Sequence, residues 1–327
     1  MSMDITFLGT GSAYPSPTRG ASALVLRREG ECWLFDCGEG TQTQFMKSHL
    51  KAGRITKIFI THLHGDHFFG LPGLLCTLSL QSSPDPNKPP VDIYGPFGLR
   101  NFIWRSMELS HSQLLFPYVV HELVPTRDQC PAEEFKEFSD LDRDEGAQGR
   151  ILHLDPVENS YLLVEDEQLV LKAFRLFHRI PSFGFVVEEK SRTGKLNVQK
   201  LKDLEAPIPG RKICILGDCS GVVGDAAVKL CCEADVLIHE ATLDDTQEEK
   251  AREHGHSTPK MAADFAKLCK VKKLVLTHFS QRYKPAAQRG EGESDITELK
   301  RQAESVLGGQ AVTLAEDFMT IEIPMKK

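Results

Sequence analysis

The feature that most constrains this sequence is a run of seven residues that holds four potential metal ligands. Residues 61–67 read Thr-His-Leu-His-Gly-Asp-His. Alternate residues of an extended segment point to one side, so His62 and His64 can face a common point, while the bend at the glycine turns Asp66 and His67 towards a second point. Imidazole nitrogens and carboxylate oxygens suit Zn²⁺, and Mn or Fe less specifically. The run predicts a metal site; a surface loop that is rich in histidine is the alternative.

Further apolar, strand-like stretches also end in a residue with a nitrogen or oxygen ligand. Strand ends along one edge of a pair of sheets form a rim, where side chains far apart in the sequence can converge. Each such residue alone has an ordinary explanation, a polar side chain that closes a strand. Together with the run at 61–67 they favour a shared site. They are Asp36 in LFDCG, His178 in FRLFH, Asp218 in ILGD, His239 in LIHE and His278 in LVLTH.

A site with two metal ions needs a ligand that both ions share. Ions about 3.5–4 Å apart repel each other unless an anion lies between them. Asp218 is the best candidate, because a carboxylate can give one oxygen to each ion. His178 and His278 then complete the two ligand sets.

The arrangement of apolar stretches indicates two packed sheets covered by helices. The N-terminal third alternates strands and turns and then gives a helix that begins at Thr41, whose side chain could cap it. The C-terminal third alternates strands with helices. Expected strands are Asp4–Thr10, Ala21–Arg27, Cys32–Asp36, Thr56–Thr61, a hairpin within Leu162–Phe177, Lys212–Leu216, Asp235–His239 and Lys273–Thr277; expected helices are Thr41–Lys51 and one from about Gly70.

Composition is that of an ordinary soluble globular protein, with 327 residues, 41% hydrophobic and 26% charged. The longest apolar stretch, Phe68–Leu80, is too short to span a bilayer. The N-terminus has no basic flank and no long apolar run, so we expect no signal peptide and no membrane association. Nine cysteines without a CxxC pair favour a reducing compartment. We therefore expect a cytoplasmic protein, with the nucleus as a further location.

The sequence resembles the ribonuclease Z family, the tRNA 3′-processing endonucleases, in its short, ElaC-type form within the metallo-β-lactamase superfamily. The HxHxDH pattern alone specifies the superfamily, whereas HFFGLPGLL, HEATL and GHST are more selective. The matching segments span nearly the whole chain in family order. They are FLGTGSAYPSPTRGAS at 7–22, LFDCGEGTQTQ at 34–44, THLHGDHFFGLPGLL at 61–75, FHRIPSFGF at 177–185, ILGDCS at 215–220, HEATL at 239–243, GHSTP at 255–259 and LTHFSQRY at 276–283.

This resemblance implies an α/β fold, the αβ/βα sandwich of two mixed sheets flanked by helices, as a single domain over residues 1–327 that forms a homodimer. It also implies two zinc ions per chain. One set of ligands would be His62, His64, His178 and Asp218, and the other Asp66, His67, Asp218 and His278.

The implied activity is removal of the 3′ trailer from tRNA precursors by attack of a metal-bound hydroxide, which leaves a 3′-hydroxyl on the tRNA. Asp66 would accept or orient the proton of the nucleophile; a role as ligand alone is the alternative. His256 in GHST would protonate the leaving group and Glu240 would orient it, with His239 close to the ligands without being one.

Some of these residues can also be interpreted without the family. Ser257 and Thr258 are N-cap types placed before Pro259, so His256 should lie at a helix start. The positive end of a helix would lower the pKa of His256 and assist phosphate binding. Arg282 and Tyr283 are candidate phosphate contacts, although a solvated surface role is as plausible.

The chain departs from the family where a protruding arm should grip the tRNA. The net charge of −7 argues mildly against nucleic acid, but Lys190–Lys202 holds five basic residues and no acid. Within it, Lys195 and Lys200 are candidate RNA contacts. The Gly- and Pro-rich part of the arm is missing, so we expect a shortened basic arm over residues 188–210; a naturally compact arm is the alternative. The shortening keeps two other functions open: a hydrolase of small phosphodiesters or thioesters, and a catalytically weak RNA-binding protein.

Overall fold

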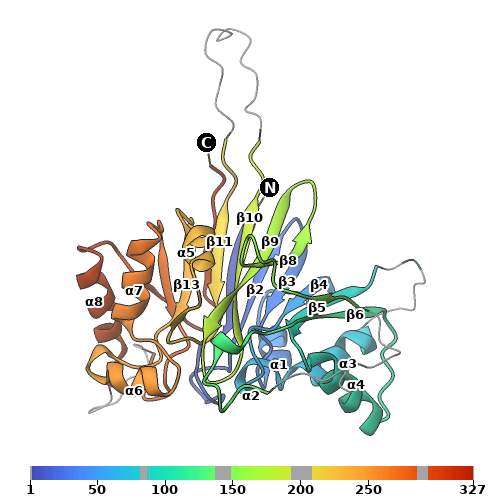
Figure 1. The fold of residues 1–327 in the computed structure, drawn as a ribbon. Helices are drawn as coiled ribbons and strands as arrows, with labels where there is room; N and C mark the ends of the chain where they lie inside the picture. Colours follow the sequence, from blue (N-terminus) through green and yellow to red (C-terminus); the bar gives the residue numbers. More distant parts are fainter. Residues whose placement is uncertain are drawn as a thin grey trace, which may run out of the picture.

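Two large β-sheets lie face to face, and helices cover the outer side of each (Figure 1). The computed structural model describes residues 2–81, 87, 89–136, 149–192, 208–285 and 294–326. The arrangement confirms the predicted sandwich of two mixed sheets flanked by helices.

The first sheet contains the N-terminal strands and the last strand of the chain. Its order is β18-β1-β2-β3-β4-β5-β6-β7, antiparallel from β18 to β3 and parallel from β3 to β7. The strands are β1 Met3–Gly9, β2 Ala23–Arg28, β3 Glu31–Phe35, β4 Ile55–Phe59, β5 Val91–Pro96, β6 Tyr118–Leu123, β7 Ile151–Leu152 and β18 Thr320–Glu322.

The second sheet contains strands from the middle and C-terminal parts of the chain. Its order is β12-β9-β10-β11-β13-β14-β17, with β8 paired to β9. Strands β8 to β11 pair antiparallel, and β11, β13, β14 and β17 are parallel. The strands are β8 Tyr161–Glu165, β9 Leu169–Phe177, β10 Ser182–Glu189, β11 Lys212–Leu216, β12 Gly221–Val222, β13 Val236–Glu240, β14 Leu274–Thr277 and β17 Thr313–Leu314; β15 Tyr283–Lys284 and β16 Ser294–Asp295 form a separate pair.

The helices bury one face each against these sheets. Residues of α1, α3 and α4 share a core cluster with the first sheet, and residues of α5, α7 and α8 share one with the second. The helices are α1 Thr41–Lys47, α2 Gly65–Phe68, α3 Leu71–Gln81, α4 Leu99–Leu109, α5 Ala226–Cys231, α6 Glu248–Glu253, α7 Pro259–Leu268 and α8 Ile296–Val306, with short 3₁₀ turns η1 Ala52–Arg54, η2 Arg127–Gln129 and η5 Asp245–Gln247. Among the described residues, no helix combines the length and apolar character needed to cross a bilayer.

The central core lies between the two sheets and consists largely of aromatic rings. Phe35 and Phe59 of the first sheet stack with centroids 4.7 Å apart, and both contact Phe185 of the second sheet. These side chains are at most 1% exposed. Burial of each such ring contributes about 1.5–3 kcal/mol, so the apolar faces hold the two sheets together.

Most predicted strands are confirmed to within a few residues, and one helix differs from its prediction. Helix α1 begins at Thr41 as expected, but its N-cap is Gly40, with φ of 84°, and it has no side-chain cap. It ends at Lys47, before the expected Lys51. Ser48 ends it: its amide donates to carbonyls of the last turn, and its hydroxyl accepts from the amide of Leu50.

Candidate metal centre

The seven predicted metal ligands lie together at one edge of the two sheets. His62, His64, Asp66 and His67 follow β4, His178 follows β9, Asp218 lies just beyond β11, and His278 follows β14. These strands all end at this edge, which explains why residues so far apart in the sequence meet. Their ligand atoms form overlapping clusters, each within 4.8 Å: His62 with His64 and His178; His62 with His67 and Asp218; Asp66 with His67 and His278; Asp218 with His256 and His278.

Asp218 lies between the two predicted ligand sets. Its Oδ1 is 3.3 Å from His67 Nε2, and its Oδ2 is 3.3 Å from His278 Nε2 and 3.7 Å from His62 Nε2. The side chain is buried. Oδ1 therefore faces a histidine of the second set, and Oδ2 lies near histidines of both sets, so the carboxylate sits where it could contact an ion in each.

Hydrogen bonds on the outer side of the site fix the tautomers of two histidines in the 61–67 loop. Asp36 accepts from Nδ1 of His67 at 2.7 Å and from the Thr61 hydroxyl at 2.9 Å. Because Thr61 gives its proton to Asp36, its oxygen accepts from Nδ1 of His62 at 3.0 Å. In both neutral imidazoles the proton is on Nδ1, so Nε2 carries a lone pair that points inward.

The same logic holds for the two histidines of the second sheet. Nδ1 of His178 donates to the Gly255 carbonyl at 2.6 Å. The Thr242 hydroxyl donates to Glu240 Oε2 at 2.5 Å, so its oxygen accepts from Nδ1 of His278 at 2.9 Å. The Nε2 atoms of all four histidines therefore converge on one small volume, and each offers a lone pair when its ring is neutral.

This donor set fits a cation. Nε2 of His67 and Nε2 of His278 are 3.2 Å apart, and two lone pairs at that distance repel unless a proton or a metal ion lies between them. Nε2 of His62 is buried and has no hydrogen-bond partner among the described residues. A buried nitrogen without a partner costs free energy, and coordination to a metal ion removes that cost.

The protonation states agree with this role. Burial, which outweighs the nearby Asp218 carboxylate, lowers the pKa of His64 to about 4 and that of His178 to about 3, so both are neutral and able to bind metal. Burial also opposes a charge on His67, but Asp218, Asp66 and Asp36 raise its pKa well above the usual value. Metal binding replaces that proton, because imidazole coordinates in its neutral form.

His256 lies beside the ligands and is held by Glu240. Its Nδ1 is 3.1 Å from Glu240 Oε1 and 3.6 Å from Asp218 Oδ2. Burial acts to lower the pKa of His256, but the charge and hydrogen bond of Glu240 raise it to about 9. The predicted lowering by the helix is therefore wrong. Helix α7 does begin at Pro259, with Thr258 as its N-cap, but the two carboxylates outweigh its dipole.

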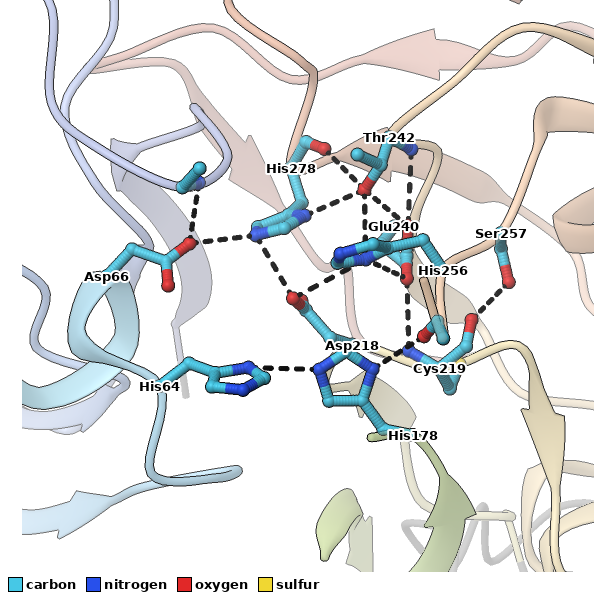
Figure 2. A network of polar contacts seen from close by, with 12 residues as sticks. His64, Asp66, His178, Asp218, Cys219, Glu240, Thr242, His256, Ser257 and His278 are labelled. Carbon is cyan, nitrogen blue, oxygen red and sulfur yellow. Dashed lines mark hydrogen bonds and ion pairs between the residues drawn. The ribbon is translucent and has the colours of Figure 1, made fainter. Parts of the chain in front are cut away.

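Glu240 and Thr242 connect the predicted acid to a metal ligand, as Figure 2 shows. Glu240 is 1% exposed; its Oε1 faces His256 and accepts from the Cys219 amide, and its Oε2 accepts from Thr242. Thr242 in turn accepts from His278. The sequence prediction included Glu240 but not Thr242, whose only signal was its place in HEATL.

The metal centre opens into a cavity of about 450 Å³. This volume is within the usual range of about 300–1,000 Å³ for ligand sites. Asp66, Asp218, His64 and His256 line it, together with exposed Arg179. Arg179 is the only arginine or lysine among the lining residues and was not predicted; its signal was its place directly after His178.

The two described residues among the predicted substrate contacts lie outside the cavity. Arg282 is exposed, and its guanidinium donates to Gln247 at 2.9 Å. Tyr283 is 3% exposed and donates its hydroxyl to Asp244 at 2.6 Å. Neither lines the cavity. Lys195 and Lys200 lie outside the described residues.

His239 is buried behind the site rather than in it. Its Nδ1 donates to the Glu240 carbonyl at 2.8 Å, and it belongs to none of the ligand clusters of the described residues. This agrees with its expected place outside the ligand set.

Comparisons with known proteins place the chain in a family. Residues 3–112 match the family model described as "Anti-Pycsar protein Apyc1", and residues 203–279 match that of the "Beta-lactamase superfamily domain". The chain is 69% identical, over 363 aligned positions and the whole of both chains, to "Zinc phosphodiesterase ELAC protein 1" of Bos taurus. It is 37% identical over 359 positions to "Ribonuclease Z" of Prochlorococcus marinus, covering 98% of this chain and 100% of that one.

A solved structure agrees with the sequence relatives. The human "tRNase Z, short form (ELAC1)" superposes with a TM-score of 0.77 and 66% identity, over 98% of this chain and 100% of that chain. The ligand geometry, the sandwich fold and full-length identity at this level point to one conclusion: the chain belongs to the ribonuclease Z family of the metallo-β-lactamase superfamily.

Proposed function

We propose that this protein is a zinc-dependent endoribonuclease that removes the 3′ trailer from tRNA precursors and leaves a 3′-hydroxyl on the tRNA. Relatives along the whole chain are named zinc phosphodiesterase and ribonuclease Z, and a similar structure is a tRNase Z. The observation that carries the proposal is the set of inward imidazole lone pairs around Asp218, which suits two zinc ions per chain.

Zinc ions would also offset the acidic lining of the cavity. Asp66, Asp218 and Glu39 line it, with Arg179 as the opposing arginine. These three carboxylates outnumber the two cationic groups of the lining, Arg179 and protonated His256, so the lining without metal is unfavourable for a phosphodiester. When bound, a pair of zinc ions supplies a hydroxide nucleophile near neutral pH and compensates the charge of the reacting phosphate.

The protein residues then divide the proton transfers between them. The Ala13 amide donates to Oδ2 of Asp66 at 2.7 Å, which fixes the carboxylate beside His278. From there Asp66 can accept or orient the proton of the attacking oxygen. His256 faces Glu240 with Nδ1, so Nε2 is the atom that gives its proton to the departing ribose 3′-oxygen. Glu240 orients the ring and favours its protonated form.

We further propose that the difference in length from the relatives falls in the tRNA-binding arm. The alignment with the bovine relative has 363 positions against 327 residues here, which leaves 36 positions without a counterpart in this chain. The described ends of the predicted arm meet: Arg192 and Ile208 exchange two backbone hydrogen bonds of 2.9 Å. A shortened arm loses binding energy remote from the reaction, so insertion of the missing Gly- and Pro-rich part should strengthen precursor binding and steepen its salt dependence.

Cleavage of a precursor tRNA that carries a 3′ trailer, compared with hydrolysis of a small chromogenic phosphodiester, tests the function. We expect cleavage at the tRNA–trailer junction, loss of both activities with a chelator, and two zinc ions per chain by metal analysis. Hydrolysis of the small substrate without precursor cleavage would instead support the small-phosphodiester function. Sedimentation at equilibrium tests the homodimer that the family resemblance implies.

A further inference from the structure

Two aromatic side chains on the cavity wall take no part in the chemistry described above. Phe69 is 60% exposed and Tyr14 is 58% exposed, and both line the cavity together with Asp66 and His256. Aromatic side chains that line a pocket beside a reaction centre provide apolar surface against which a ligand can pack. Neither side chain belongs to the predicted ligand sets, so both can contact the substrate instead.

The ring of Phe69 is held in place. It lies against Gly65, where an added Cβ would come within 2.4 Å of its Cε2 atom. Its centroid is 5.0 Å from that of Phe68 and 6.3 Å from that of Phe102, and the ring planes of Phe69 and Phe102 are 22° apart. A ring supported in this way, and still mostly exposed, is a preorganised platform.

The backbone beneath Tyr14 is fixed to the metal centre. The preceding residue, Ala13, donates its amide to Asp66 at 2.7 Å and has φ of 69°, a left-handed conformation that non-glycine residues seldom adopt. Gln281 donates to the Tyr14 carbonyl at 2.7 Å. Tyr14 therefore projects from a loop that cannot shift without disturbing Asp66.

We propose, on the basis of the endonuclease function above, that Phe69 and Tyr14 stack the two RNA bases that flank the scissile phosphate. A single-stranded segment exposes the faces of its bases, and aromatic rings bind those faces irrespective of sequence, because every base has a π-face. The phosphate between two such bases lies over the metal centre. This explains how the enzyme can position junctions whose bases differ from one precursor to the next.

Kinetic cycles with abasic substrates test the proposal. Precursors are made with an abasic site at the last tRNA nucleotide or at the first trailer nucleotide, and kcat/KM is measured for the parent and for Phe69→Leu and Tyr14→Leu. Each leucine variant should lose about 10- to 100-fold on the intact precursor. It should lose less than about threefold on the substrate that lacks its own partner base. Phe69→Trp and Tyr14→Phe should keep near-parent activity, because they retain a ring.

Phe318→Leu is the matched control, since Phe318 is 40% exposed and lies outside this cavity; it should act like the parent. Equal losses of a leucine variant on intact and both abasic substrates would overturn base stacking. A change of oligomeric state in Phe69→Leu would instead assign the ring to a protein interface. Failure of the proposed function is distinguishable, because then the parent itself leaves the intact precursor uncut.

Discussion

Among the predicted ligands, Asp218 is the residue whose loss should affect the metal centre most. Among the described residues, it alone has one oxygen near His67 and the other near both His62 and His278. Asp218→Ala removes the shared anion, so two cations at short distance would repel each other. We expect the variant to retain fewer than one zinc per chain by metal analysis, with no detectable cleavage. Two retained ions would remove Asp218 from the bridging role.

His256 should matter for proton transfer rather than for metal binding. His256→Ala should keep its zinc content and precursor affinity and lose about 10²–10⁴ in kcat. A precursor with sulfur in place of the 3′-oxygen has a leaving group that needs no proton, so on it the loss should nearly vanish. An equal loss on both substrates would contradict general-acid catalysis. Glu240→Gln serves as the intermediate case, since it keeps the ring in place and removes the charge that favours its protonated form.

At the level of single residues, the sequence predicts what a local pattern encodes. The residue pattern brought the seven predicted ligands together as candidates, but it also included Asp36 and His239, and the resemblance to the family separated these two from the ligand sets. Thr242 and Arg179 were not predicted as site residues. Their places in the site depend on which strands become neighbours, and residue spacing along the chain does not indicate that. The sequence placed Tyr283 at a phosphate or at the surface, and neither expectation accounted for a distant contact. Its hydroxyl donates to Asp244, 39 residues away, and its ring is buried. The pKa of His256 reversed its predicted direction because Glu240 reaches it only in the folded chain.

At the scale of elements, Glu189 and Arg211 join the end of β10 to the start of β11. Arg211 donates from Nε at 2.8 Å and from Nη2 at 2.6 Å to the two oxygens of Glu189, and from Nη1 to the Ile323 carbonyl at 2.9 Å. Burial acts to raise the pKa of Glu189, but these hydrogen bonds lower it overall. A lowered pKa stabilises the fold above the pKa of the unfolded state, about 4.3, and that stability is lost as the pH falls through the folded pKa.

Glu189→Gln should therefore be less stable than the parent at pH 7, and the gap should narrow as the pH falls below about 4.5. Urea unfolding at several pH values measures this difference directly. Glu165→Gln is the control, because Glu165 and Lys190 form an exposed pair at 3.1 Å that should contribute little. A constant gap between Glu189→Gln and the parent at all pH values would show that the loss is one of packing.

Elements were predicted better than their ends. Continuous apolar runs mark buried parallel strands, so β4, β11, β13 and β14 agree closely with expectation. The end of α1 at Lys47 depends instead on hydrogen bonds of Ser48, which have no periodic signature. The apolar stretches predicted two packed sheets, but not which strands pair within each sheet, because apolar alternation does not specify partners.

At the scale of the whole molecule, the ligands come from both sheets. His62 to His67 follow a strand of the first sheet, while His178, Asp218 and His278 follow strands of the second. An ion bound by both groups stabilises the folded state and leaves the unfolded chain largely unaffected. Thermal unfolding with zinc should show a higher midpoint than with a chelator, and free zinc at 100 times its dissociation constant should add about 2.7 kcal/mol. The shift should persist in Glu189→Gln and disappear in Asp218→Ala; an equal shift in both variants would mean that zinc acts elsewhere.

This division of the ligands has a consequence for the protein during its synthesis. The chain leaves the ribosome from its N-terminus, and the loop at 61–67 emerges long before His278. Until the last third of the chain has been made and β14 has joined its sheet, the loop can offer only part of a ligand set. We therefore expect a nascent chain to hold metal weakly, and a product truncated before His278 to lack the proposed RNA cleavage. The order of the strands along the chain would therefore delay nuclease activity until translation is nearly complete, because β14 and His278 come late.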